Sequence, residues 1–259
     1  MFNLLSAVLS SAVDEKRIRV NPCKARGVKK PVPDKRKVTP WTEVRLRAIQ
    51  LALPPRQSIV IPLGSGLGLR QGEILGLSPD DIDREQMILH VNRQLACIGN
   101  RSLLKLPKGR KTRRVPLSRG LLDSIDDYMD AHPPVTITLP WGKTNAEPIS
   151  VRLLVVASAN RVDTGTGFNH RYWRPAFTTA GLTYVGGEDG MHALRHFYAS
   201  TLLARGVTIK ELADYLGHAD PGFTLRTYTH LLPSSHEQAR RAMDSIFKPR
   251  QPEQLIAGS

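Results

Sequence analysis

Cysteine is scarce in this chain, which carries only Cys23 and Cys97 among its 259 residues. Two cysteines cannot build a disulfide framework, and neither of them stands at a spacing typical of metal ligands. The sequence therefore predicts no cysteine-based metal site. The scarcity of cysteine also favours a protein of the reducing cytoplasm.

Long apolar runs are lacking as well, since none approaches the length of a membrane span. The first residues, MFNLLSAVLSSAV, could pass for the core of a signal peptide, but no basic residue precedes them. Their apolar positions Phe2, Leu5, Leu9 and Val13 recur at helical spacing, which favours a packed amphipathic helix that continues to about Arg19. No membrane partner is therefore expected.

Acidic residues are outnumbered, with 23 Asp and Glu against 37 Lys and Arg, a net charge of +14 and an isoelectric point near 10.2. An excess this large indicates a polyanionic partner, either nucleic acid or an anionic membrane surface. The basic residues stand in blocks, which favours nucleic acid. One block, KARGVKKPVPDKRK at residues 24–37, is typical of a semi-extended linker. That linker could be a solvated tether or could follow DNA phosphates.

Most of the chain has the pattern of short helices. Its hydrophobic content of 41% is enough for a sizeable core. Cap and proline signals predict a helix that opens at Thr39 and Pro40, and a second helix over about 56–63. A glycine-rich turn then leads to Arg70, at the start of a short helix that ends near Leu77.

Short strands follow these helices. Turn signals at Gly99-Asn100 and Gly109 separate three predicted strands, which span residues 87–91, 101–106 and 113–117. Residues 121–128 have a helical pattern, and the chain beyond Gly190 is expected to be almost wholly helical to Phe247. The predicted fold class is mainly α with a small antiparallel β-sheet, an α+β fold.

Residues 191–233 gather the groups needed to attack a DNA phosphodiester without a metal. They place His192 and Arg195 three residues apart, His218 after a predicted helix, and Tyr228 ten residues further on. Residues at i and i+3 share one helix face, so His192 and Arg195 can meet the same phosphate. Phosphodiester transfer needs a nucleophile, a proton acceptor, charge neutralisation at phosphorus and a proton donor for the leaving oxygen.

This segment resembles the C-terminal half of the tyrosine recombinases, or phage integrases, whose signature is HxxR, then LGH, then the nucleophilic tyrosine. Residues 64–83 resemble the first arginine box of that family, and residues 107–117, PKGRKTRRVPL, resemble its lysine hairpin. Several ordered boxes are more specific than any one of them. The resemblance implies the catalytic fold of DNA breaking-rejoining enzymes and the activity of a site-specific recombinase.

The resemblance implies a role for each matching residue. Tyr228 would attack the scissile phosphate, form a 3′-phosphotyrosyl bond and free a 5′-hydroxyl, with no cofactor and no ATP. Arg70 and Arg195 would clamp the phosphate, since a guanidinium pairs with two oxygens and stays charged. Their charge would also lower the pKa of the Tyr228 phenol, which is ordinarily near 10. Glu73, one turn after Arg70, would buttress an arginine.

Three of the four histidines of this segment stand in or next to its motifs. The resemblance makes His192 the acceptor of the tyrosyl proton, because histidine titrates near neutrality. It makes His218 a hydrogen-bond donor to a non-bridging phosphate oxygen. His196 directly follows Arg195, so we expect it to point to another face and to have a structural role.

A lysine completes the implied site. Lys108, at the tip of a predicted hairpin, would enter the minor groove and protonate the leaving 5′ oxygen. It stands eight residues before Pro116, where the lysine of the resembling family stands. On chemistry alone the neighbouring Lys105 and Lys111, or an arginine of the same stretch, could serve instead.

The resemblance also implies a domain organisation. Residues 1–37 resemble the last helix of an N-terminal core-binding domain followed by a basic linker, residues 38–248 the catalytic domain, and residues 249–259 a flexible tail. Most of the core-binding domain is thus expected to be missing. The expected partners are double-stranded DNA at attachment sites and a homotetramer on that DNA, with directionality or host DNA-bending factors as further candidates. Such a protein would be nucleoid-associated.

A final helix is predicted over residues 234–247. Ser234 and Glu237 form a capping box, and Ile246 and Phe247 end an apolar stripe. That stripe could dock on its own domain or, as in the resembling family, on a neighbouring subunit.

Two other functions fit part of the pattern. A type IB topoisomerase shares the chemistry, but the spacing from LGH to Tyr228 favours a recombinase. A non-catalytic regulator could read DNA with a helix-turn-helix at residues 199–218. That reading leaves Arg70, Lys108 and Tyr228 unexplained.

Overall fold

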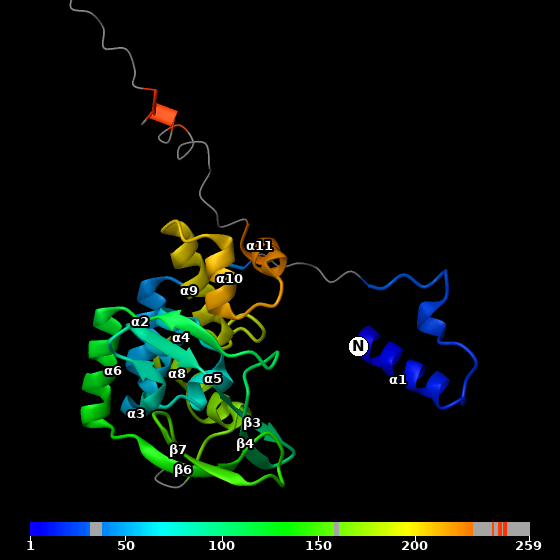
Figure 1. Cartoon of the computed structure of the whole chain (residues 1–259), viewed down its shortest axis with the longest axis horizontal. Coiled ribbons are helices and arrows are strands. Elements are labelled where there is room, and N and C mark those ends of the chain that lie inside the picture. The colour runs from blue at the N-terminus through cyan, green and yellow to red at the C-terminus, as the bar shows by residue number, and fades with distance from the viewer. Residues whose placement is uncertain (32–37, 158–160, 230–239, 241–242, 245, 248–259) are drawn as a thin grey trace, which may run out of the picture. The chain divides into compact units, whose positions relative to one another are not determined.

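The computed structural model describes residues 1–31, 38–157, 161–229, 240, 243–244 and 246–247 (Figure 1). The chain divides into two compact units, Met1–Lys37 and Val38–Ser259. The first unit contains helix α1 (Phe2–Asp14) and a short 3-10 helix at Pro22–Lys24.

Helix α1 ends before Arg19, the end that the sequence indicated. Lys16 has a left-handed φ of 57°, a conformation that a continuing right-handed helix does not contain. Asn21 then holds the following segment against α1. Its side-chain amide donates to the Ser6 carbonyl at 2.8 Å and to the Ser10 hydroxyl at 2.9 Å. Within the described residues α1 buries no side chain, so the predicted packing of its apolar face is not observed.

Some helices of the second unit begin or end at recognisable caps. Thr42, and not Thr39 as expected, caps α2, since its hydroxyl accepts from the Arg45 amide at 3.2 Å. Gly68, with φ of 61°, ends α4 in the left-handed conformation that glycine adopts without strain. The α-helices of this unit are α2 (Glu43–Ala52), α3 (Pro55–Ser58), α4 (Val60–Leu67), α5 (Gln71–Leu75), α6 (Arg119–Ala131), α7 (Gly165–Phe168), α8 (Arg174–Thr179), α9 (His192–Ala204), α10 (Ile209–Leu216) and α11 (Pro221–Tyr228).

The strands form small antiparallel sheets, which confirms the predicted α+β class. The strands predicted at residues 87–91, 101–106 and 113–117 are present with slightly shorter bounds. The first sheet contains β1 (Ile82–Asp83), β2 (Ile88–Val91) and β5 (Arg113–Pro116), the second β3 (Gln94–Ile98) and β4 (Arg101–Lys105), and the third β6 (Val135–Pro140) and β7 (Pro148–Leu153).

The prediction that Lys108 lies at the tip of a hairpin is wrong. Strand β4 pairs with β3 across the Gly99-Asn100 turn, whereas β5 pairs with β2. Residues 106–112 therefore connect two different sheets, through a turn in which the Arg110 amide donates to the Pro107 carbonyl at 2.9 Å. Turn signals are local, but the partner of a strand depends on residues far away in the sequence.

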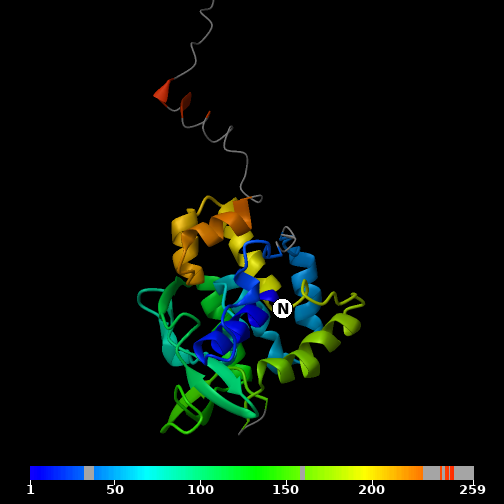
Figure 2. The same cartoon turned by 90° about the vertical axis from the view of Figure 1, so that its right-hand side faces the viewer.

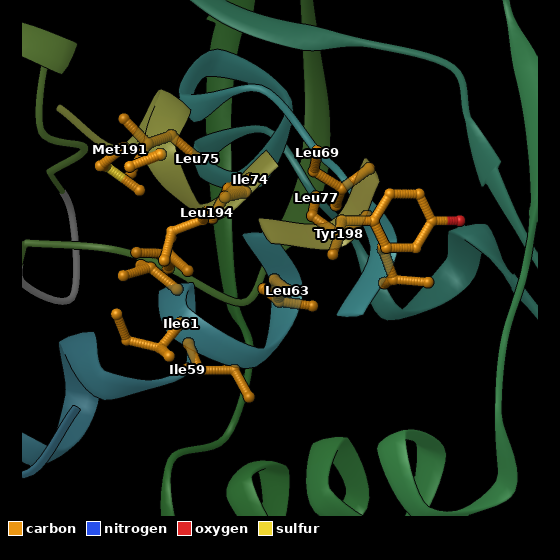
Figure 3. Close-up of a cluster of buried hydrophobic side chains, with 14 of the residues drawn as sticks. Ile59, Ile61, Leu63, Leu69, Ile74, Leu75, Leu77, Met191, Leu194 and Tyr198 are labelled. Atoms are coloured by element: carbon orange, nitrogen blue, oxygen red, sulfur yellow. The ribbon is translucent and has the colours of Figure 1, made fainter. Parts of the chain in front are cut away.

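The core of the second unit is centred where α4, α5 and α9 meet (Figure 3). Leu63 on α4 and Leu194 on α9 are fully buried. The helices approach closely because Gly64 has no side chain: a Cβ there would lie 2.6 Å from Leu194 Cδ1. This contact sets the close approach of α4 and α9.

Helices α10 and α11 lie at one end of the second unit, and the β6–β7 hairpin lies at the other (Figures 1 and 2). The helical pattern predicted beyond Gly190 is confirmed as far as Tyr228. The predicted capping box of Ser234 and Glu237 lies outside the described residues. Ile246 and Phe247 are described, and both are exposed, by 67% and 71%.

We predict that Gly64→Ala destabilises the protein, because the added methyl group must displace Leu194. Overpacking of this kind typically costs about 1–3 kcal/mol. Gly120→Ala is the matched control, since its Cβ on α6 meets nothing within 4 Å and alanine favours a helix by up to ~1 kcal/mol over glycine. Urea unfolding should give opposite signs for the two changes. Equal free energies of unfolding for both variants would contradict the close contact of α4 with α9.

Candidate active site

Arg70 stands at the junction of α4 and α5, where it is the N-terminal cap of α5. Its backbone amide donates to Oε2 of Glu73 at 2.8 Å, and its Nη1 donates to Oε1 at 3.0 Å. Its Nη2 lies 3.5 Å from the carbonyl oxygen of Gly217. Glu73 thus holds the Arg70 side chain against the turn that precedes His218.

The carboxylate of Glu73 is shared by two arginines. Arg113 on β5 makes a two-pronged contact with it, from Nη1 to Oε1 at 2.8 Å and from Nη2 to Oε2 at 2.7 Å. Burial raises the pKa of Glu73, but the hydrogen bond and charge of Arg113, and then the contacts with Arg70, outweigh burial and lower it to about 2. Glu73 is therefore ionised at neutral pH.

Arg195 on α9 is fully buried. Its Nη1 donates to the Gly68 carbonyl at 2.7 Å, and its Nη2 donates to the Leu216 carbonyl and, at 3.0 Å, to Nε2 of His218. Within the described part of the chain nothing accepts a hydrogen bond from its Nε. Burial, and then the charge of Arg70, lower the pKa of Arg195, yet a guanidinium stays protonated in proteins. A buried cation with an unpaired donor can stabilise a bound anion.

His218 follows Gly217, which ends α10 with φ of 63°. Arginine can only donate, so the contact with Arg195 requires that Nε2 of His218 is unprotonated. Nδ1 then carries the hydrogen and donates to Thr224 Oγ1 at 2.6 Å. Burial, and then the charges of Arg195 and Arg70, lower the pKa of His218 to about 3, which agrees with a neutral ring.

Four of the predicted site residues face one cavity of about 1170 Å³. Arg70, His192 and His218 line it from the start of α5, from α9 and from the connection between α10 and α11, and Lys108 lines it from the connection between β4 and β5. The predicted Arg195 lies outside its described lining. A concave surface that collects basic side chains from distant segments suits a phosphate group. The other lysines and arginines that line it are Lys111, Arg113 and Arg114.

Lys108 is exposed on the connection between β4 and β5. Its charge is close enough to contribute to the lowered pKa of His192, after burial and the charges of Arg195 and Arg70. Of the two alternative lysines, Lys111 lines the same cavity. Lys105 is on β4 and is not part of the described cavity lining.

Tyr228 ends α11, is only 2% exposed, and lies outside the described lining of the cavity. Its hydroxyl is 2.7 Å from Nδ1 of His196. The expectation that His196 points away from the site is therefore wrong. His196 stands one helical turn after His192 and shares its face, and the centroids of the two rings are 4.6 Å apart.

The tyrosine and its neighbouring histidines are neutral at pH 7. Burial raises the pKa of Tyr228 to about 12 against the opposing charge of Arg195, so the predicted lowering is wrong for this conformation. Burial is also the main reason that the pKa values of His192 and His196 fall to about 4. Both rings are therefore unprotonated at neutral pH, and the expectation that His192 titrates near neutrality is wrong for this conformation.

Sequence reasoning missed the contacts of Arg113, His196 and Thr224. The spacing of His196 four residues after His192 was a usable signal, because i and i+4 lie on one face. The alternation of faces along a strand was a usable signal for Arg113, because it places Arg113 on the face of the apolar Val115 and Arg114 on the other face. Thr224 is buried and bonds to His218. This contact depends on how the connection between α10 and α11 folds, which the local sequence does not indicate.

Among the described residues, no group of three or more His, Cys, Asp or Glu side chains could hold a metal ion. Cys23 and Cys97 are free thiols. No described helix combines the length and the apolar character needed to cross a membrane.

Residues 45–235 match the phage integrase family. The chain is 27% identical to a tyrosine recombinase XerC-like protein of Caldanaerobacter subterraneus subsp. tengcongensis, over 95% of this chain and 65% of that protein. It is 25% identical to the integrase of Mycobacterium phage D29, over 93% of this chain and 60% of that protein. The chain thus spans less than two thirds of either relative.

A solved structure shares the fold. The integrase of the Tn1549 transposon, in complex with a circular intermediate DNA, superposes with a TM-score of 0.70 at 19% identity, over 94% of this chain and 77% of that one. Because the family match covers most of the chain, the chain belongs to the phage integrase family, and the resemblance drawn from its motifs is confirmed.

We predict that acid destabilises the fold through the buried histidines. The pKa values of His192, His196 and His218 are about 4, 4 and 3 in the folded chain, below the value of about 6.5 expected when unfolded. Between about pH 6.5 and 4 the unfolded chain therefore binds more protons, so the free energy of unfolding falls as the pH falls.

The substitution His196→Gln isolates the contribution of one histidine to the pH dependence of stability. The glutamine side-chain amide can still bond to Tyr228 but does not titrate. Urea unfolding at pH 7.5 and pH 5 should show a weaker pH dependence for this variant, where each unit of pKa depression corresponds to about 1.4 kcal/mol. The exposed His170 provides the control substitution, His170→Gln. An unchanged pH dependence in His196→Gln would contradict the buried neutral ring.

Proposed function

We propose that this chain acts in site-specific DNA recombination or integration, by cutting and rejoining DNA strands through a 3′-phosphotyrosyl bond at Tyr228. The observation that best supports this function is that Arg70 and His218 line one basic cavity and that the buried Arg195 bonds to His218. The relatives are named recombinase and integrase, and the Tn1549 integrase was solved with circular intermediate DNA. The proposed substrate is double-stranded DNA at attachment sites.

The proposed role of the arginines is to hold the scissile phosphate. The Nη2 of Arg70 makes only a long contact of 3.5 Å with a carbonyl oxygen, and the Nε of Arg195 has no acceptor among the described residues. Phosphate oxygens would accept from both. Fixed positive charge at the cavity would stabilise the additional negative charge of the pentacoordinate phosphorus.

Tyr228 must exchange its contact with His196 for the phosphate, because its hydroxyl lies outside the described lining of the cavity. We assign proton acceptance to His192, which lines the cavity and is neutral at pH 7. The phenol proton passes to the imidazole, and the phenolate oxygen bonds to phosphorus. The bond from phosphorus to the 5′ oxygen breaks.

Lys108 is the proposed donor of the proton that the leaving 5′ oxygen takes up. It lines the cavity on an exposed connection, where a flexible ammonium group can follow the DNA strand. His218 would donate to a non-bridging oxygen once its Nε2 carries a proton, which a bound phosphate anion favours. Glu73 would hold Arg70 in place.

The larger assembly is also a proposal. Residues 38–248 would form the catalytic domain and residues 1–37 the last helix and basic linker of a core-binding domain, with 249–259 a tail. Four copies would assemble on paired sites, with directionality or host DNA-bending proteins as further partners. The net charge of +14 should make DNA binding strongly salt-dependent.

We predict that nicked suicide DNA becomes joined to Tyr228, because the freed 5′ fragment diffuses away before religation. A protein–DNA adduct should appear on denaturing gels, disappear in Tyr228→Phe and persist in Tyr184→Phe, which removes a hydroxyl distant in sequence from the site. Because the proposed charge neutralisation comes from arginines, the adduct should also form in EDTA. An undiminished adduct in Tyr228→Phe would refute the assignment, and strict Mg²⁺ dependence would refute the mechanism.

We predict that Lys108→Ala is slow on normal DNA and largely rescued on DNA whose bridging 5′ oxygen is replaced by sulfur. A thiolate leaves readily without a proton, so the general acid is no longer needed. Lys105→Ala and Lys111→Ala are the matched controls and should show no such rescue. Rescue of Lys111→Ala instead would identify Lys111 as the donor.

A further inference from the structure

We propose that Arg113 is a positioning residue of the active site, which sets the geometry of Arg70 and His218 without touching the DNA phosphate. This inference rests on the proposed function. It assigns a role to a residue whose side chain is only 6% exposed. Its neighbour Arg114, on the same strand, is exposed and serves as a comparison.

The guanidinium of Arg113 is held by protein groups. Both Nη atoms donate to the Glu73 carboxylate at 2.8 and 2.7 Å, and Nε donates to the carbonyl of Tyr215 at 2.7 Å. A guanidinium with these contacts is oriented in its plane and along its length. Arg113 therefore ties β5 to α5 and to the last turn of α10.

Glu73 transmits this orientation to Arg70. Its Oε1 accepts from the Nη1 atoms of both arginines, and its Oε2 accepts from Arg113 and from the Arg70 backbone amide. Of the two side chains, only Arg113 donates to both oxygens, so its planar guanidinium helps to set the plane of the carboxylate. A rotated carboxylate would carry the Arg70 guanidinium away from the cavity.

The second contact of Arg113 is with the turn that delivers His218. A Cβ on Gly217 would lie 2.9 Å from Arg113 Cδ, so the arginine stem packs directly on that glycine. Gly217 ends α10 with φ of 63°, and His218 follows it. The position of the arginine stem thus limits where His218 can lie relative to Arg70.

Arg113 also begins β5, directly after the connection that carries Lys108. One side chain therefore touches or adjoins the three segments that supply Arg70, Lys108 and His218. A lysine could supply the charge but not two parallel hydrogen bonds and a third from Nε. The role that we infer therefore depends on the shape of the guanidinium as well as on its charge.

The test compares Arg113→Met and Arg113→Lys with Arg114→Met in the full chain. Arg113 and Arg114 both line the cavity, so each methionine removes one positive charge from the same surface. Arg114 bonds to Gln86 and not to Glu73. The comparison thus separates general attraction for DNA from the positioning of Arg70.

The readouts are the duplex affinity and the single-turnover rate of adduct formation at saturating protein, with folding checked by thermal unfolding. We expect both Arg113 variants to lower this rate at least about tenfold relative to Arg114→Met, while the affinities of Arg113→Met and Arg114→Met stay similar. We also expect that Arg113→Lys does not restore the single-turnover rate of adduct formation. Equal rates for Arg113→Met and Arg114→Met, or full rescue by lysine, would overturn the inference.

A second readout does not require cleavage. Inorganic phosphate, followed by ³¹P NMR titration, should bind the unaltered chain more tightly than Arg113→Met, and the loss should exceed that in Arg114→Met. Should the unaltered chain form no adduct, the proposed function fails and this titration alone decides the role of Arg113. Equal losses in the two variants, or no specific phosphate binding by the unaltered chain, would overturn the inference. A variant that is unfolded is replaced by Arg113→Gln, to which the same outcomes apply.

Discussion

The arrangement of the site depends on the ion pairs that the buried carboxylate of Glu73 makes with Arg70 and Arg113. Burial alone would favour its neutral form, but Arg113 and Arg70 hold its pKa at about 2. Its negative charge in turn makes it possible to hold arginines close together in a poorly solvated place. Within the described chain Arg195 is held by no carboxylate; its guanidinium donates instead to the carbonyl oxygens of Gly68 and Leu216. Arg70 and Arg113 can therefore line one cavity, while the buried Arg195 bonds to His218 beside them, before any DNA is bound.

The positions of several candidate site residues were predictable because these residues stand in short motifs. HxxR places His192 and Arg195 within one helical turn, and the sharp end of α10 at Gly217 places His218. The fold class and the three predicted strands were predictable from turn signals and apolar patterns. These are local properties, for which the backbone periods of helices and strands are a sufficient guide.

The features of the site that the sequence did not predict depend on contacts between residues far apart in the chain. Strand β5 pairs with β2 and not with β4, so the connection that carries Lys108 joins two sheets and is not the tip of a hairpin. The pKa of Tyr228 was expected to fall because of nearby positive charge, yet burial of α11 raises it to about 12. The partner of that phenol is His196, and only the packing of α11 on α9 reveals this contact.

The most direct test of this account is the free energy of unfolding of Glu73→Gln, measured in urea with and without sulfate. Removal of one charge of a buried pair typically costs about 3–5 kcal/mol, because the partner charge stays uncompensated. We expect a loss of this size, partly restored by sulfate, because an anion in the cavity would replace the missing negative charge. A variant as stable as the unaltered chain, with no response to sulfate, would contradict the central role of Glu73.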